Sequence, residues 1–171
     1  MNRLNTIVLI AACALPFGAA ARKDRLIYDV LKPSETCLVV GVSDGDTIKV
    51  RCGAEPDYRQ INIRISGIDA PEKKQAFGQR SKESLSDLCF QQQAVVTPDK
   101  RDRYGRTVAA VRCRGQDVGL HQVTAGMAWW FVKYGRDAGV QAAEGRARAG
   151  RVGLWADVVP VPPWEFRRAV K

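Results

Sequence analysis

Three short segments of the chain carry acidic and guanidino side chains close to turn residues. They are Asp44–Thr47, Arg64–Glu72 and Asp102–Arg106. Their carboxylates can surround a hard divalent cation, which prefers oxygen ligands. Their arginines carry planar guanidinium groups that fit two phosphate oxygens at once. The combination is typical of a site that binds a phosphodiester together with a metal ion.

Phosphodiester hydrolysis requires an aligned water molecule and compensation for the negative charge that grows on the phosphorus oxygens. Asp46, Asp69 and the backbone carbonyl of Ala70 are the expected metal ligands. These oxygens, completed by waters, suit Ca²⁺, and Mg²⁺ stays open as an alternative. We expect Arg64 and Arg106 to clamp the phosphate.

The remaining candidates lie next to these residues. Glu72, three residues after Asp69, is expected to hold and activate the attacking water. Tyr104 and Tyr134 are expected to stack on or flank a nucleotide, and Arg103 to contact phosphate.

Each segment taken alone also fits an ordinary turn. Asp44 and Asp46 flank a glycine, which is a common turn composition. Arg64 can face solvent from a strand, and Arg106 can be a hairpin residue. The joint occurrence of all three segments favours the catalytic interpretation.

The first residues have the pattern of a secretory signal peptide. Arg3 precedes an apolar run over residues 7–15, and small residues follow through residue 21. We therefore expect a periplasmic or secreted protein. A lipoprotein box ending at Cys13 is the alternative. The apolar run is too short to span a bilayer, so no stable membrane insertion is expected.

The charge balance agrees with a polyanionic partner. The formal net charge is +9, of which only the charge on Arg3 lies in the predicted leader. A small domain this basic attracts nucleic acid, although solubility alone also explains such a charge.

Four cysteines remain after the leader, and an even number in an exported chain predicts two disulfides with three possible connectivities. The spacings contain no close cysteine pair and the chain has one histidine, His121, which disfavours zinc. The four are Cys37, Cys52, Cys89 and Cys113.

Apolar periodicity predicts short strands, a meander first, followed by helices. Asp69 ends the third strand, and strand pairing in the meander can bring it to Asp46. The pattern indicates an α+β fold, a five-stranded OB-type β-barrel with three helices. The strands are expected at 37–42, 47–52, 58–65, 94–97 and 107–113, and the helices at 75–91, 117–128 and 137–150.

The predicted organisation has four parts. A signal peptide over 1–21 is followed by a polar N-terminal arm over 22–36. The barrel domain extends over 37–157, and a proline-rich, extended C-terminal tail over 158–171.

With these motifs in this order, the chain resembles the thermonuclease (staphylococcal nuclease) family from about Cys37 to Trp155. The segments 126–128 and 153–155 also look like family landmarks. The resemblance implies an OB-fold barrel with three helices. It also implies Ca²⁺-dependent, sugar-nonspecific cleavage of DNA and RNA that leaves 3′-phosphates.

Carried over by motif position, the resemblance implies calcium ligation by Asp46, Asp69 and the Ala70 carbonyl. It implies that Arg64 and Arg106 bind the scissile phosphate and stabilise its transition state.

The same motifs imply that Glu72 positions or activates water and that Asp44 supports the metal shell indirectly. Tyr104 and Tyr134 match nucleotide-pocket tyrosines, and Arg103 matches a phosphate contact.

The chain departs from the family at a few positions. Ala70 replaces a common threonine, which a backbone ligand tolerates, and Val132 replaces an expected pocket aromatic. The link from Glu72 to the first helix is short. The four cysteines are additional. On the family's barrel Cys37 and Cys52 would lie across the first hairpin, and Cys89 could then meet Cys113.

Two other functional classes compete with the nuclease hypothesis. A non-catalytic nucleic-acid-binding module would use the same barrel, but it would have lost acids or arginines that this chain keeps. A structural envelope protein would need a strongly basic amphipathic segment, which the chain lacks. We expect a monomer.

Overall fold

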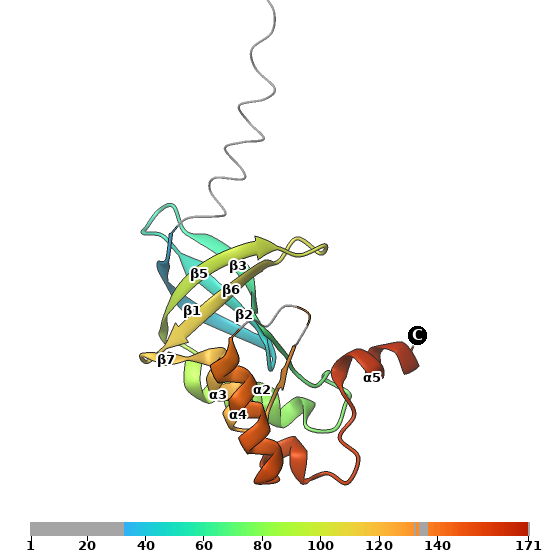
Figure 1. Cartoon of the computed structure of the whole chain (residues 1–171). Helices are drawn as coiled ribbons and strands as arrows, with labels where there is room; N and C mark the ends of the chain where they lie inside the picture. The colour runs from blue at the N-terminus through green and yellow to red at the C-terminus, as the bar shows by residue number, and fades with distance from the viewer. Residues whose placement is uncertain (1–32, 132, 134–136, 171) are drawn as a thin grey trace, which may run out of the picture.

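The computed structural model describes residues 33–131, 133 and 137–170. Five long strands form its centre, and several shorter elements surround them (Figure 1). The long strands are β1 (Glu35–Asp44), β2 (Thr47–Cys52), β3 (Arg59–Ile65), β5 (Gln93–Arg101) and β6 (Thr107–Cys113).

The five strands close into a barrel. Their order is β3-β2-β1-β5-β6, in which neighbours are antiparallel, and a parallel pairing of β3 with β6 joins the two edges. The pairing of β3 with β6 thus joins the two edges of the sheet formed by the described strands. The predicted five-stranded OB-type barrel is therefore confirmed.

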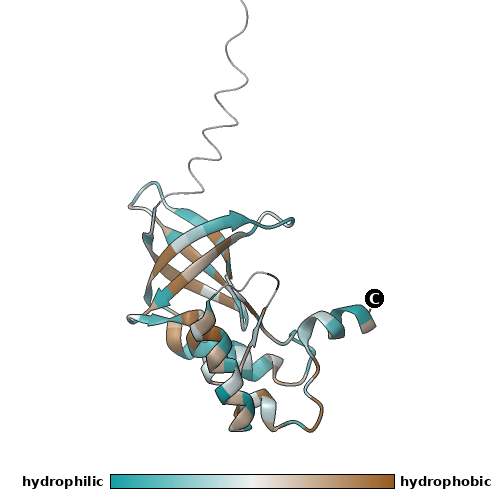
Figure 2. Ribbon diagram, in the orientation of Figure 1, coloured by the Kyte–Doolittle hydropathy of each residue, from teal (hydrophilic) through white to brown (hydrophobic). Residues whose placement is uncertain are grey.

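Alternation of side chains explains why these segments form the barrel. Ile48 and Val50 of β2 and Ile63 and Ile65 of β3 are buried, whereas the charged and polar residues between them face outward. Figure 2 shows the same alternation of hydrophobic and hydrophilic residues along the strands.

Three helices lie at one end of the barrel (Figure 1): α2 (Gly78–Cys89), α3 (Val118–Thr124) and α4 (Ala138–Ala149). Asp117 and Asp137 are the N-caps of α3 and α4, and their carboxylates accept from backbone N–H groups of the first turn. Leu85 and Val123 extend the barrel core into these helices. The three predicted helices are present, each shorter than expected.

A fourth helix, α5 (Pro163–Ala169), was not predicted, because the tail was expected to be extended. Pro163 is its first residue, a position where proline's fixed φ favours a helix. Smaller elements are β4 (Ile68–Asp69), β7 (Gln116–Asp117), β8 (Trp129–Trp130) and the 3₁₀ turn η1 (Gly153–Ala156). Among the described residues, every helix is too short or too polar to cross a membrane.

Two predicted boundaries are wrong. Strand β1 begins at Glu35 and pairs with β5 there, so the end of the predicted arm belongs to the barrel. Asp69 does not end the third strand, since β3 stops at Ile65. A turn through Gly67, which has φ 73°, leads instead into β4, and β4 pairs with β8.

Two disulfides connect the elements, with the pairing that the resemblance implied. Cys37–Cys52 crosses the β1–β2 hairpin with a Cα–Cα distance of 4.4 Å. Cys89–Cys113 ties the end of α2 to β6 with a Cα–Cα distance of 5.4 Å. Each cross-link of this kind contributes about 2–4 kcal/mol to stability.

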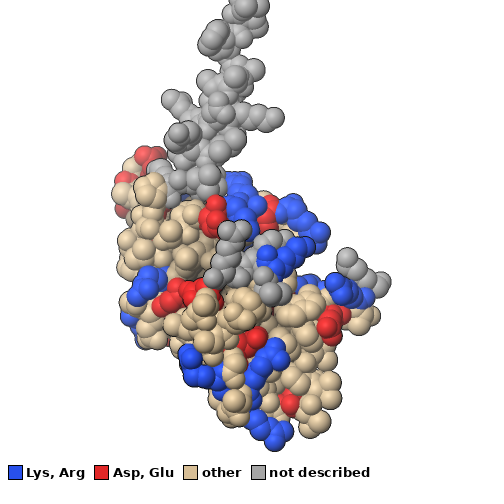
Figure 3. All heavy atoms as spheres, viewed as in Figure 1, with Lys and Arg blue, Asp and Glu red and all other residues tan. Residues whose placement is uncertain are grey.

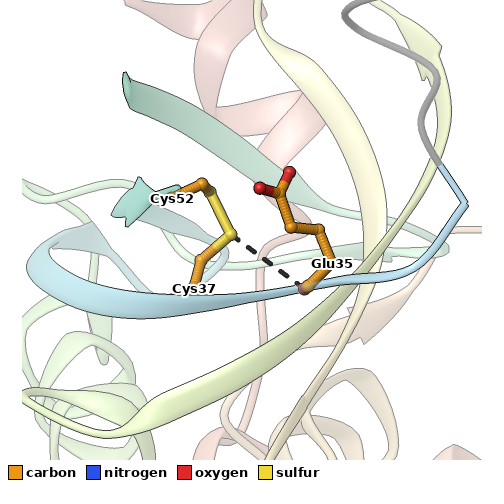
Figure 4. Close-up of side chains that lie close together, drawn as sticks. All are labelled: Glu35, Cys37 and Cys52. Carbon is orange, nitrogen blue, oxygen red and sulfur yellow. Dashed lines mark hydrogen bonds between the residues drawn. A yellow bond between two sulfur atoms is a disulfide. The ribbon is translucent and has the colours of Figure 1, made fainter. Parts of the chain in front are cut away.

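The carboxylate of Glu35 lies near the first disulfide (Figure 4). The two sulfurs are bonded to each other and cannot act as thiolate ligands. Glu35 instead accepts from Arg59, with an Nη2–Oε1 distance of 2.7 Å. This cluster is a structural feature of the hairpin and not a metal site.

The two glycine-containing landmarks of the sequence meet in space. Gly126 and Gly153 both have positive φ, 63° and 58°. A Cβ on Gly126 would lie 2.1 Å from the Val152 oxygen, and a Cβ on Gly153 would lie 2.4 Å from the Gly126 oxygen. The N–H of Leu154 donates to the Gly126 carbonyl at 2.9 Å. Only glycines permit this contact, which fixes the aromatic cluster around η1.

We predict that Gly126→Ala lowers the free energy of unfolding by about 2–4 kcal/mol, because the new Cβ meets rigid backbone and the φ is unfavourable. Urea unfolding followed by circular dichroism measures this change.

Gly145→Ala is the matched control. Gly145 lies in α4 with open space around its Cα, so alanine should stabilise the protein by about 0.5–1 kcal/mol. Equal effects of the two substitutions would contradict the role given to the close approach.

Candidate active site

Arg64 joins the acids of two segments that are distant in sequence. The register of β2 with β3 sets Thr47 opposite Arg64, so the β1–β2 turn lies beside this guanidinium. Its Nη1 forms an ion pair with Asp46 Oδ2, and its Nη2 donates to Asp69 Oδ1 at 2.9 Å. The structure thus brings Asp46, Asp69 and Arg64 together.

Both carboxylates are buried, with 6% of Asp46 and 1% of Asp69 exposed. A buried charge is tolerated only when it is paired and hydrogen-bonded. Asp46 accepts from the Thr47 hydroxyl at 2.9 Å and from the Ala70 N–H at 2.8 Å. The hydrogen bond from the Ala70 N–H also holds the backbone of Ala70 next to Asp46.

The cluster holds an excess of negative charge near Asp46. Burial and the charge of Asp46 raise the pKa of Asp44 to about 6. Burial also raises the pKa of Asp69 despite its arginine partners. Burial lowers the pKa of Arg64, but the charges of Asp46 and Asp69 outweigh this and raise it above its ordinary value. A cation is therefore favoured beside these acids.

The turn that carries Asp44 and Asp46 packs against helices α2 and α3. Asp44 Oδ1 accepts from the Asp46 N–H at 3.1 Å, as in an ordinary Asx turn. A Cβ on Gly45 would lie 1.7 Å from Ser81 Oγ, so α2 packs directly against the turn. The buried Gln122 donates to the Gly45 carbonyl at 2.8 Å. These contacts therefore fix the position of the turn and of the two acids that it carries.

Sequence reasoning missed Gln122 and Ser81. Gln122 is fully buried and also donates to the Ser81 carbonyl at 3.0 Å, so it links α2, α3 and the acidic turn. A glutamine between the apolar residues of a short helix was the available signal, but its partners depend on tertiary structure.

Glu72 lies at the edge of the cluster with 41% of its side chain exposed. Its backbone carbonyl accepts from the Gln75 N–H at 2.8 Å, so a compact turn connects it to α2. The predicted short link is present.

Arg167 of α5 is a third residue that sequence reasoning missed at this site. Its Nη2 lies 2.7 Å from Asp69 Oδ2, and its Nη1 lies 2.7 Å from Glu72 Oε1. Arg167 therefore bridges the carboxylates of Glu72 and Asp69. Nothing in the sequence of the tail distinguishes it from its neighbour Arg168.

Arg106 lies in a separate turn, between β5 and β6. Its Nε and backbone N–H donate to Asp102 at 2.7 and 2.9 Å. Although burial alone raises the pKa of Asp102, the hydrogen bonds from Arg106 lower it below its ordinary value. Asp102 thus holds Arg106 in a defined orientation.

The closure of the barrel relates Arg106 to Arg64. The parallel register sets Arg64 opposite Val108, two residues beyond Arg106. Arg106 directly precedes β6, so it lies near the start of the strand that pairs beside Arg64.

The predicted nucleotide contacts lie at the tip of this hairpin. Tyr104 is 68% exposed, and the guanidinium of Arg103 lies 4.8 Å from its ring centroid. Figure 3 shows Lys and Arg around the hairpin tip and α5, with acids among them. The predicted residue Tyr134 and the departure at Val132 lie outside the described residues.

Three tryptophans pack together. Trp129 and Trp155 are buried in a second core cluster, with ring centroids 4.3 Å apart, and Trp164 packs beside Trp129. This agrees with a structural role rather than a binding platform.

The donor set fits a hard cation. Asp46 and Asp69 share Arg64, and the Ala70 N–H donates to Asp46, so carboxylate oxygens from two segments lie in one cluster without sulfur or imidazole. Oxygen-only sites of this kind suit Ca²⁺ or Mg²⁺. Guanidinium groups beside a bound cation can hold an anionic phosphate.

Comparison with known proteins agrees with this geometry. Residues 62–157 match the family described as "Staphylococcal nuclease homologue". An uncharacterized endonuclease of Haemophilus influenzae is 42% identical over 150 residues, which cover 85% of this chain and 83% of that protein. A micrococcal nuclease of Shigella flexneri is 40% identical over 144 residues, 78% of this chain and 80% of that protein.

More distant relatives occur in plants. Staphylococcal-like nuclease CAN1 of Arabidopsis thaliana is 37% identical over 110 residues, which cover 64% of this chain and 34% of that protein. With the barrel, the paired acids and the arginines in place, the chain belongs to the staphylococcal nuclease family and is a nuclease.

Proposed function

We propose that the protein is an exported, Ca²⁺-dependent, sugar-nonspecific nuclease that hydrolyses DNA and RNA and leaves 3′-phosphates. The contact of Arg64 with both buried acids, Asp46 and Asp69, is the observation that carries this proposal. This contact supports a cation site and a phosphate-binding guanidinium within one cluster.

Asp46, Asp69 and the carbonyl of Ala70 would hold the cation, and Asp44 would support them through the Asp46 N–H. Bound there, Ca²⁺ would supply positive charge to the scissile phosphate and orient it. Their burial supports this role, because buried carboxylates are dehydrated in advance.

Arg64 and Arg106 would bind the non-bridging oxygens of the phosphate. Their positive charge stabilises the phosphorane-like transition state more than the ground state, because negative charge grows on these oxygens. Asp102 keeps Arg106 oriented through two hydrogen bonds.

Glu72 would position and deprotonate the attacking water. Its side chain is partly exposed and lies near Asp69, where water and substrate can reach it. Attack of this water on phosphorus would break the bond to the 5′ oxygen, which takes up a proton and leaves as a 5′-hydroxyl, and the phosphate would stay on the 3′ oxygen. Arg103, Tyr104 and Tyr134 would contact the neighbouring nucleotide.

Export to the periplasm or the medium is supported by the leader-like first residues and by the two disulfides. Disulfides persist in oxidising compartments and are rare in the cytosol of most organisms. We also propose that the protein is a monomer, that its leader covers residues 1–21 and that its tail covers residues 158–171.

The metal requirement is testable directly. The protein without residues 1–21, incubated with DNA or RNA, should cleave both in Ca²⁺, and excess EGTA should stop cleavage reversibly. End analysis by polynucleotide kinase labelling with and without phosphatase should identify 3′-phosphates. Binding without cleavage under every metal condition would support the binding module instead.

The guanidinium clamp predicts a large effect of a conservative change. Arg106→Lys should reduce kcat/KM by about 10²–10³-fold, because lysine keeps the charge but loses the planar fork. Steady-state cleavage of a fluorogenic oligonucleotide measures this value.

Arg146→Lys is the matched control, since Arg146 is an exposed arginine on α4. Its kcat/KM should equal that of the unchanged protein. Full activity of Arg106→Lys would rule out the proposed clamp.

A further inference from the structure

Arg167 occupies acidic groups that the proposed chemistry requires. It reaches both oxygens of Asp69, at 2.7 Å from Oδ2 and 3.2 Å from Oδ1, and it also pairs with Glu72. These are a proposed metal ligand and the proposed water-activating group. Arg167 lies beyond the family match, which ends at residue 157.

The segment that carries Arg167 is held against the domain at identifiable points. The ring of Trp164 lies 5.6 Å from that of Trp129 and 5.5 Å from that of Phe131. Gln75 Nε2 donates to the Val161 carbonyl at 2.6 Å. Figure 1 shows α5 beyond the helices that cover the end of the barrel, close to the chain end.

This attachment is limited. Within α5 only Pro163 is buried, and Val158 and Val159 before it are 87% and 71% exposed. A hollow of about 200 Å³ remains between the tail and a wall formed by Pro71, Phe77 and Trp129. Segments with few buried contacts open at low free-energy cost, so α5 can leave the site without unfolding the barrel.

The contacts of Arg167 conflict with a divalent cation at the same acid. A Ca²⁺ ligand must direct an oxygen lone pair at the metal. Asp69 Oδ1 already accepts from Arg64, and the fork of Arg167 adds a second contact to Oδ1 and takes Oδ2, which leaves little of this carboxylate for Ca²⁺. A guanidinium and a dication on one carboxylate also repel each other. Each cation therefore weakens the binding of the other.

We propose that α5 is an autoinhibitory segment whose Arg167 closes the active site, and that divalent metal binding and α5 docking exclude each other. This inference rests on the proposed function, because it requires the metal site at Asp46 and Asp69. A tethered cation acts at high effective concentration, so it lowers the apparent metal affinity in proportion to the docked fraction. Release of α5 exposes Asp69 and Glu72 together.

Calorimetric Ca²⁺ titration of the chain without residues 1–21 tests this exclusion. Arg167→Gln should bind Ca²⁺ about three- to tenfold more tightly than the unchanged protein. Arg168→Gln is the matched control, because it removes the same charge from an exposed neighbour on the same helix, and it should change the affinity little. Trp164→Leu, which loosens docking without changing charge, should also tighten binding.

Amide hydrogen exchange gives a second measurement without catalysis. Adding Ca²⁺ to the unchanged protein should speed exchange in α5 and leave α2 unaffected. Measurable Ca²⁺ binding that is equal or weaker in Arg167→Gln would overturn the autoinhibitory role and leave the metal site intact. Absence of Ca²⁺ binding in every variant would overturn the metal site and this inference with it.

Discussion

The pairing of one guanidinium with two buried carboxylates is the interaction on which the site depends. Arg64 contacts both Asp46 and Asp69, which lie almost wholly out of solvent. Two dehydrated anions in proximity repel each other, and without a cation between them the site would be strongly destabilised. The position of Arg64 on β3 is in turn fixed by hydrogen bonds to β2 on one side and β6 on the other. Barrel closure and the charge arrangement therefore stabilise each other.

The topology explains how residues far apart in sequence form one cluster. The β1–β2 turn delivers Asp46, and β4, pinned by its pairing with β8, delivers Asp69. Gln122 and Ser81 hold the turn from the helical side, so the site lies at the junction of the barrel with α2 and α3. Side chains supported by packed elements keep their geometry better than side chains on free loops. The hairpin that carries Arg106 is more exposed, and Asp102 orients Arg106 locally.

The sequence was sufficient to predict the strands along which apolar and polar residues alternate regularly. Strands β2 and β6 match the predicted ranges residue for residue, because apolar and polar residues alternate along them. The two-residue strand β4 has no period to detect, so the position of Asp69 relative to β3 was predicted wrongly. Motifs predicted the acids and Arg64, which come together in the structure. Gln122 and Arg167 act through partners 77 and 98 residues away, and no local pattern reports such contacts.

Arg167 also addresses a stability problem that the site creates. Asp46 and Asp69 share Arg64, but the acids of the cluster outnumber it, and buried negative charge without a partner lowers the stability of the folded state. With α5 docked, both oxygens of Asp69 and one oxygen of Glu72 have a cationic partner. The acids can then remain paired while the chain folds, before any metal is bound. Because α5 is weakly attached, this second partner would be able to leave Asp69 and Glu72 when a metal ion binds, whereas Arg64 stays in place on the barrel.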